Sequence, residues 1–170
     1  MTFSNRLFFI FIFFFLNIPQ AKSSEPIAYI DMDFVIKNSE IGKKTFDIID
    51  SLNKNNINEL KKKEKILKDL EIEITSKKNL ISKEAFEKEV IIFRKNVDQF
   101  KIEQQQIIKD FNDYKKKEID KVFQTISPII NSYMEKNYVK ILFDAKNIFM
   151  ARNDLNLTND ILEAINKEAK

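Results

Sequence analysis

Residues 86–114 read FEKEVIIFRKNVDQFKIEQQQIIKDFNDY, and their apolar residues recur in alternating steps of four and three. This is the heptad pattern of a helix that lies along a partner helix, and it is sustained for four repeats. The members of this seam are Phe86, Val90, Phe93, Val97, Phe100, Ile107, Phe111 and Tyr114, with Gln104 as the polar residue in the remaining position. After Tyr114 the pattern slips by one residue and continues at Ile119, Phe123 and Ile126. We expect the rod to bend most easily at Gln104 and at this slip.

A partner helix is predicted directly upstream, from near Glu40 to Ser76. Its seam consists of Phe46, Ile49, Leu60, Leu67, Leu70 and Ile74, with Asn53 as a polar interruption. The chain is predicted to turn within residues 76–82, where Ser82 is a suitable N-cap for the second helix. That helix is expected to run to about Lys136, with a kink at Pro128. Two facing seams joined by a short turn predict an antiparallel helical hairpin over residues 40–126, with its tip near 76–82.

Strand-forming sequence flanks the hairpin on both sides. Ile27 to Phe34 is rich in β-prone residues, and Tyr138 to Asp144 followed by Ile148 to Arg152 is typical of a β-hairpin. Thr158 is predicted to cap a closing helix. The fold class is therefore α+β and mostly helical, with a small β-rich body formed by residues 24–39 and 127–170. A body of this size buries little apolar surface, so we expect it to assemble with copies of itself.

The first 23 residues have the composition of a secretory signal peptide. A short n-region ends at Arg6, an apolar run from Leu7 to Leu16 follows, and small residues at Ala21 and Ser23 predict cleavage after Ser23. An uncleaved N-terminal anchor is the alternative, although ten apolar residues are too few to span a bilayer. The chain has no cysteine, which excludes disulfides and a lipid-modified cysteine.

The residue types argue against an enzyme. The chain has no histidine, no cysteine and one glycine, which excludes zinc and thiolate sites, nucleophile–histidine pairs and a phosphate-binding glycine loop. We expect no cofactor and no metal, because Asp31 and Asp33 are more suited to capping the following turn than to holding a cation. The lysine runs 61–63 and 115–117 are flanked by acidic residues and lack interleaved aromatics, so nucleic acid is not an expected partner.

Several isoleucines of the predicted rod lie away from its seam, where a two-helix rod is exposed to water. They are Ile72, Ile91, Ile92, Ile102 and Ile108. Two interpretations remain open. Either they broaden the contact between the helices or reflect an isoleucine-rich composition, or they provide apolar contact points for a partner. Residues 51–121 carry 18 basic and 14 acidic residues, so the rod is mildly basic.

The order of motifs along the chain resembles one known family. A signal peptide precedes Ile27-Ala-Tyr-Ile-Asp-Met-Asp33, then Ser39-Glu-Ile-Gly42, a charged helical hairpin, Tyr138-Val-Lys-Ile-Leu-Phe-Asp144 and Leu157-Thr158-Asn-Asp-Ile161-Leu162. This order is similar to that of the Skp (OmpH-like) family of periplasmic chaperones. Gly42 stands at the family's glycine near the base of the first long helix, and Asn156 replaces an aspartate that many members have before the last helix.

The resemblance implies a jellyfish-like homotrimer, in which hairpin tentacles hang from a shared β-barrel body. It implies an ATP-independent periplasmic holdase that keeps unfolded outer-membrane proteins soluble, and it makes a membrane surface or lipopolysaccharide a candidate partner. The alternative is a periplasmic coiled-coil adaptor or structural protein that binds one folded partner. The expected client contacts are the five off-seam isoleucines with Lys77, Lys78, Arg94 and Lys95. The expected trimer contacts are Ile27, Tyr29, Phe34, Val139, Ile141, Phe143 and Phe149.

Overall fold

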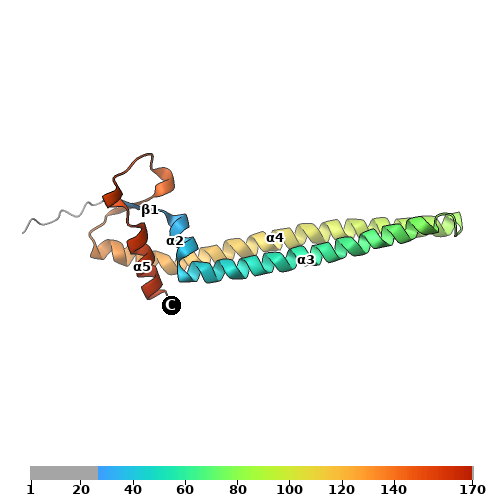
Figure 1. Ribbon diagram of the computed structural model, residues 1–170, viewed down its shortest axis with the longest axis horizontal. Coiled ribbons are helices and arrows are strands. Elements are labelled where there is room, and N and C mark those ends of the chain that lie inside the picture. Colours follow the sequence, from blue (N-terminus) through green and yellow to red (C-terminus); the bar gives the residue numbers. More distant parts are fainter. Residues whose placement is uncertain (1–26, 170) are drawn as a thin grey trace, which may run out of the picture.

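The computed structural model describes residues 27–169, and the predicted signal peptide lies outside them. A helical hairpin extends from a small body that holds both ends of the described chain (Figure 1). In chain order the elements are β1 (Ile27–Ile30), α2 (Met32–Asn38), α3 (Glu40–Lys77), α4 (Lys83–Lys136), β2 (Ile141–Asp144), the 3-10 helices η1 (Ala145–Asn147) and η2 (Asn153–Leu155), and α5 (Thr158–Glu168).

Helices α3 and α4 lie side by side and form the hairpin (Figure 1). At 1.5 Å per residue, the 38 residues of α3 span about 57 Å and the 54 residues of α4 about 81 Å. The chain reverses at residues 78–82, and the Ser82 hydroxyl caps α4 by accepting a hydrogen bond from the Ala85 N–H at 3.3 Å. Helix α4 continues through Pro128 as one element.

The seam of α4 departs from the predicted one at two positions. Gln104 is exposed, and its neighbour Glu103 is half-buried instead, because Glu103 forms an ion pair with Lys63 on α3. Near the base, Phe123 is 36% exposed whereas Val122 is 2% exposed. The prediction that Gln104 and Phe123 occupy the seam was therefore wrong. The large apolar side chain of Phe123 favoured its assignment, but the helix turns the smaller Val122 toward the body.

The strands of the body pair in parallel, which contradicts the predicted β-hairpin. Ile27 pairs with Ile141 and Tyr29 with Phe143. The fold therefore joins β1, which precedes the helical hairpin in the chain, to β2, which follows it. Residues 148–152 form no strand. Asp144 ends β2 because its side chain accepts a hydrogen bond from the Lys146 N–H at 3.1 Å and starts η1.

The core of the body is built from β1 and the short helices α2 and α5, which pack on the base of α4. Its buried residues are Ile30, Val35, Ile36, Val122, Ile126, Ile130, Ile161 and Ile165. Three of these, at positions 122, 126 and 130, belong to α4, so the hairpin and the body share one continuous helix. The orientation of the hairpin is thereby fixed to the body at its base.

A sharp corner joins α2 to α3 at Ser39, which is fully buried. The Ser39 hydroxyl donates to the Ile36 carbonyl and accepts from the Gly42 N–H, both at 3.1 Å. At Gly42, an added Cβ would lie 1.6 Å from the Ile36 carbonyl oxygen. Only glycine therefore allows the two helices to approach this closely.

Two predicted local features are different in the structure. The first strand ends at Ile30 and not at Phe34, because the Asp31 side chain accepts from the Phe34 N–H at 2.9 Å and caps α2, as predicted for this carboxylate. Thr158 is not the cap of α5. Asn156 Oδ1 accepts from the Thr158 N–H at 3.0 Å, and the Thr158 hydroxyl accepts from the Asp31 N–H at 2.9 Å, which ties α5 to the end of β1.

Candidate functional site

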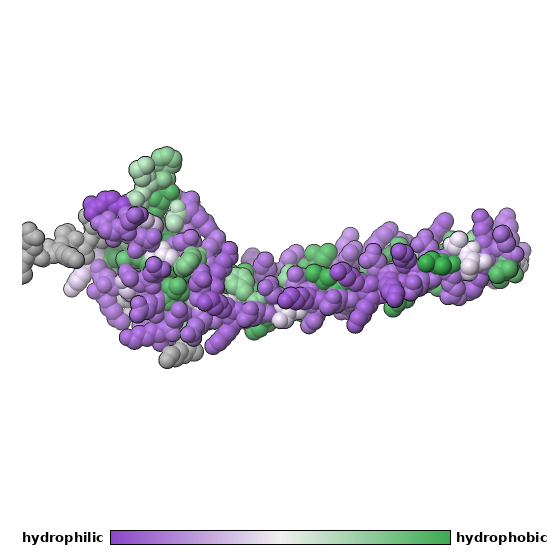
Figure 2. Space-filling model, in the orientation of Figure 1, coloured by the Kyte–Doolittle hydropathy of each residue, from purple (hydrophilic) through white to green (hydrophobic). Residues whose placement is uncertain are grey.

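The off-seam isoleucines of the hairpin point into solvent. Their side chains are between 50% and 64% exposed, which is far more than a contact between α3 and α4 would allow. They are Ile72, Ile91, Ile92, Ile102 and Ile108. This exposure contradicts the interpretation that they broaden the contact between the helices, and it is compatible both with an isoleucine-rich composition and with contact to a partner. Apolar residues are scattered along a mostly hydrophilic rod (Figure 2).

The structure adds three exposed isoleucines that the sequence analysis did not name: Ile48, Ile57 and Ile66, with Ile66 65% exposed. All three lie on α3, and Ile57 and Ile66 line the grooves that follow its apolar seam. The signal was present in the sequence, because a residue's distance from the seam predicts its exposure. The Asn-rich stretch 53–58 makes the seam of α3 harder to follow than that of α4, which hid Ile48 and Ile57.

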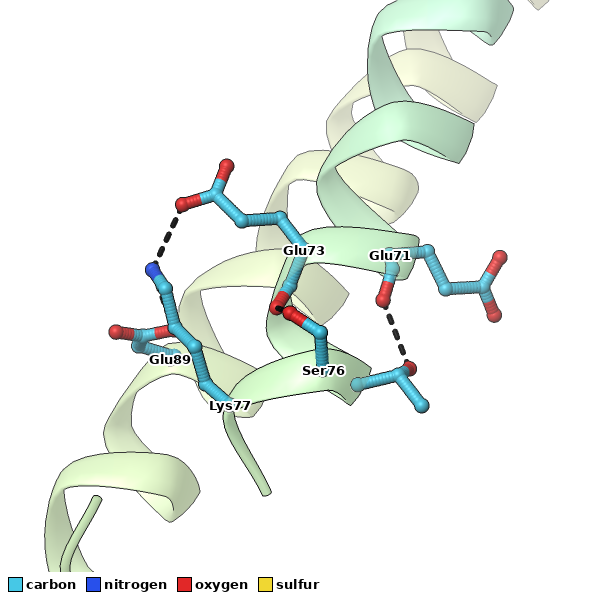
Figure 3. A network of polar contacts seen from close by, with 6 residues as sticks. Glu71, Glu73, Ser76, Lys77 and Glu89 are labelled. Carbon is cyan, nitrogen blue, oxygen red and sulfur yellow. Dashed lines mark hydrogen bonds and ion pairs between the residues drawn. The ribbon is translucent and has the colours of Figure 1, made fainter. Parts of the chain in front are cut away.

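Three of the four expected basic contacts are free to meet a partner. Lys78, Arg94 and Lys95 are exposed. Lys77 is half-buried at the seam, with its Nζ 2.7 Å from Glu73 Oε1 and 3.5 Å from Glu89 Oε2 (Figure 3). The hydrogen bond to Glu73 and the charge of both carboxylates raise the pKa of Lys77 above its ordinary value. Lys77 is therefore paired with carboxylates of the hairpin itself.

A second lysine has the same arrangement nearer the body. Lys63 Nζ lies 2.8 Å from Glu103 Oε2 across the seam and 3.4 Å from Glu59 Oε1 on its own helix. The hydrogen bond between Lys63 and Glu103 raises the pKa of the lysine and lowers that of the carboxylate. Both side chains are charged over the whole neutral range.

Grooves follow the hairpin where its two helices meet. One groove, of about 710 Å³, has Leu60, Leu67, Phe93, Val97 and Phe100 among its lining residues. Lysines and glutamates line the same groove, so its composition is apolar and charged of both signs. A smaller groove of about 280 Å³ shares Leu67 and Phe100 and also includes the exposed Ile66. The seam residues are therefore partly accessible from outside the hairpin.

The body presents an apolar surface of its own. On the outer face of the two-stranded sheet, Ile27 is 44%, Ile141 48% and Phe143 45% exposed, and Tyr29 lies half-buried between them. Phe34 is 43% and Phe149 100% exposed, and Val139 is half-buried. Figure 2 shows an apolar projection at the edge of the body. A two-stranded parallel sheet with an open apolar face is rarely stable alone, because parallel sheets are normally covered on both faces.

Within residues 27–169, the structure places no three histidine, cysteine, aspartate or glutamate residues together as a metal site would require. Over the same range, no helix combines the length and apolar character that crossing a bilayer demands. Asp31 and Asp33, weighed as cation ligands from the sequence, have separate roles. Asp31 caps α2, and Asp33 Oδ1 lies 2.7 Å from Lys146 Nζ on η1.

Comparisons with known proteins agree with this architecture. The model of the outer membrane protein (OmpH-like) family matches residues 26–165. No curated protein sequence matches the chain. Among solved structures, the chain is similar to an OmpH-like candidate outer membrane chaperone from Caulobacter crescentus CB15, with a TM-score of 0.76 and 15% sequence identity over 84% of each chain. At this identity the likeness is one of fold.

Proposed function

The chain belongs to the OmpH-like outer membrane protein family, and from this premise we propose that it is a periplasmic, ATP-independent holdase chaperone. Its clients are unfolded outer-membrane β-barrel proteins, which it keeps soluble in transit. The observation that carries this proposal is the set of isoleucines held in solvent along both long helices. A residue type that is normally buried gives such a rod contact points for exposed apolar chain segments.

The proposed mechanism relies on many weak contacts. A strand of an unfolded barrel exposes an apolar side chain at every second position and aggregates readily. One exposed isoleucine binds such a strand weakly, but each contact raises the effective concentration of the next one along the same rod. Lys78, Arg94 and Lys95 add attraction to acidic client segments, which salt weakens. Release requires transfer to a partner that binds the client more tightly.

Self-assembly through the body is the second part of the proposal. The outer sheet face with Ile27, Ile141 and Phe143, together with Phe149, offers apolar surface that a second copy would cover. Three copies would surround a client with three hairpins, as in the family that the chain resembles. Mass measurement in solution on the mature protein is expected to give a trimer, and a stable monomer would contradict this part.

A direct aggregation assay tests the holdase function. An outer-membrane barrel unfolded in urea is diluted into buffer with the purified mature protein, from residue 24 onward, and light scattering is followed. Near-stoichiometric amounts are expected to suppress scattering. An adaptor that binds one folded partner, which is the alternative function, would leave the barrel to aggregate as it does in buffer alone.

The basic rod also bears on lipid partners. Binding of the mature protein to vesicles with anionic headgroups, and its loss at high salt, would show whether a membrane surface or lipopolysaccharide is a partner. This experiment is independent of the holding assay, because it contains no client.

A further inference from the structure

Two ion pairs cross the hairpin seam at corresponding places. In an antiparallel hairpin, the numbers of two residues that face each other add to a constant. The sum is 166 for Lys63–Glu103 and also for Lys77–Glu89, so both pairs belong to the same alignment of α3 against α4. Each lysine also binds a glutamate four residues earlier on its own helix, Glu59 and Glu73 respectively. The four side chains of the cross-helix pairs are 35–39% exposed, so they lie at the edge of the seam and not on its outer surface.

The two pairs are 14 residues apart, which is two heptads. Midway between them, Leu70 and Asn96 line the same small groove, and their numbers also add to 166. Along this edge α3 therefore presents Lys63, Leu70 and Lys77 at heptad spacing, and α4 presents Glu103, Asn96 and Glu89. The polar pattern alternates and repeats every 14 residues, whereas the apolar seam repeats every seven.

This difference in period distinguishes the native alignment from its nearest error. A heptad seam that slips by seven residues still pairs apolar residues with apolar ones: Leu67 then meets Ile107 or Phe93 in place of Phe100. The edge pattern does not survive such a slip intact, although one direction places Lys63 opposite Asp110. In either direction Leu70 meets a glutamate, and Lys77 meets Asn96 or Ser82 and loses Glu89. Polar residues at seam positions are known to select one register at some cost in stability.

We propose that Lys63–Glu103 and Lys77–Glu89 form a register lock, which excludes heptad-slipped hairpins and so fixes the length and the tip of the rod. The lock contributes little to stability, because ion pairs exposed to this degree are weak. Its effect is on the difference in free energy between the native and the slipped alignments. A slip breaks the Lys77–Glu89 pair and also places Leu70 against a carboxylate. This inference concerns the hairpin alone and does not depend on the proposed function.

Distance measurement between two spin labels tests the lock. The absence of cysteine allows labels at Ile72→Cys and Ile102→Cys, both on exposed positions, and an excess of unlabelled protein removes distances between chains. In the native register the two positions are offset along the rod by about 12 Å, and a heptad slip changes this offset to about 2 Å or about 22 Å.

The expected result is one distance population in the otherwise unchanged protein and a second, slipped population of at least about a tenth of the molecules in Glu103→Lys. The charge swap Lys63→Glu with Glu103→Lys restores the single population. As a matched control, Glu64→Lys reverses an exposed acid that belongs to neither the Lys63–Glu103 nor the Lys77–Glu89 pair, and it keeps the native distance.

Three results would overturn the proposal. Glu103→Lys retains the single native distance, the charge swap leaves the slipped population as large as in the single variant, or Glu64→Lys slips as well. If Glu103→Lys loses its helical circular dichroism, the charge swap still decides, because recovery of both helix and native distance supports the lock and failure to recover contradicts it.

Discussion

Replacement of Gly42 by alanine should test the corner that joins the body to the hairpin. An alanine Cβ would lie 1.6 Å from the Ile36 carbonyl oxygen and 2.8 Å from Ser39 Oγ, whereas real contacts of this kind are essentially never below 3.0 Å. The two helices must therefore separate by more than 1 Å. This movement disturbs the Ser39–Gly42 hydrogen bond and the buried residues Val35 and Ile36 beside it.

The expected change in the free energy of unfolding of Gly42→Ala is the sum of three contributions, two of which destabilise and one of which stabilises. Overpacking costs about 3 kcal/mol in a rigid site, and weakening the cap adds about 1 kcal/mol. The higher helix propensity of alanine returns about 1 kcal/mol. We therefore expect Gly42→Ala to lower the free energy of unfolding by about 3 kcal/mol, which corresponds to a fall in Tm of about 6–12 °C for a chain of this size.

Thermal and urea unfolding followed by circular dichroism, at one fixed protein concentration, measures this change. The matched control is Asn55→Ala, an exposed position in the same helix, where propensity alone predicts a gain of a few tenths of a kcal/mol. At Gly42 the two effects predict opposite results. Helix propensity alone would raise the free energy of unfolding of Gly42→Ala, whereas the close packing lowers it. An unchanged or higher Tm for Gly42→Ala would refute the close approach of α2 and α3.

Three further perturbations probe the body. Ile126→Ala, at a fully buried site, should lower the free energy of unfolding in urea by about 2–5 kcal/mol. Phe123→Ala, one turn earlier, should lower it clearly less, and equal losses would place Phe123 in the core. Ser39→Ala removes the side-chain cap of α3 and should lower the free energy of unfolding, measured by calorimetry, by about 1–2 kcal/mol. An unchanged free energy of unfolding would contradict that role. The hydrogen bond from Lys146 lowers the pKa of Asp33, so this pair stabilises the fold above the ordinary aspartate pKa and is lost as pH falls below about 4. Asp33→Asn should therefore be less stable than the unchanged protein at pH 7, and the difference should shrink progressively as pH falls below about 4 and through the lowered pKa of Asp33. A difference that does not shrink over this fall in pH would exclude the pair as its cause.

The hairpin was predictable because its apolar period is long and regular. Eight residues from Phe86 to Tyr114 are half-buried as expected, and both long helices occur near their predicted bounds. Period alone could not decide between Gln104 and Glu103. The heptad count favours Gln104, but Lys63 on the other helix attracts Glu103, and that contact joins residues 40 positions apart.

The body was less predictable, because its contacts join distant parts of the chain. The stretch from Ile148 to Arg152 has strand-forming residues, yet β2 finds its partner at Ile27–Ile30, more than 110 positions away, and pairs in parallel. Thr158 is a good cap by composition, but its hydroxyl bonds the Asp31 N–H, which only the folded body brings near. Local propensity carries no information about either contact.

The exposed isoleucines were predictable as positions but not as a binding site. The seam identifies the residues that contact the partner helix. The isoleucines outside the seam are therefore expected to be exposed. Their exposure is a property of one chain, whereas the proposed contact with a client involves a second molecule. The structure therefore turns the sequence prediction into a defined surface for experiment.

The most direct test of the account is the holding capacity of a variant in which Ile91, Ile92 and Ile102 are serine, measured against the unchanged protein at equal helical circular dichroism. We expect the variant to keep its helical circular dichroism, and several-fold more of it to be needed to suppress scattering of the diluted barrel. Full holding capacity in a folded variant would contradict the claim that these side chains contact clients, and melting of the hairpin would contradict their place outside the seam.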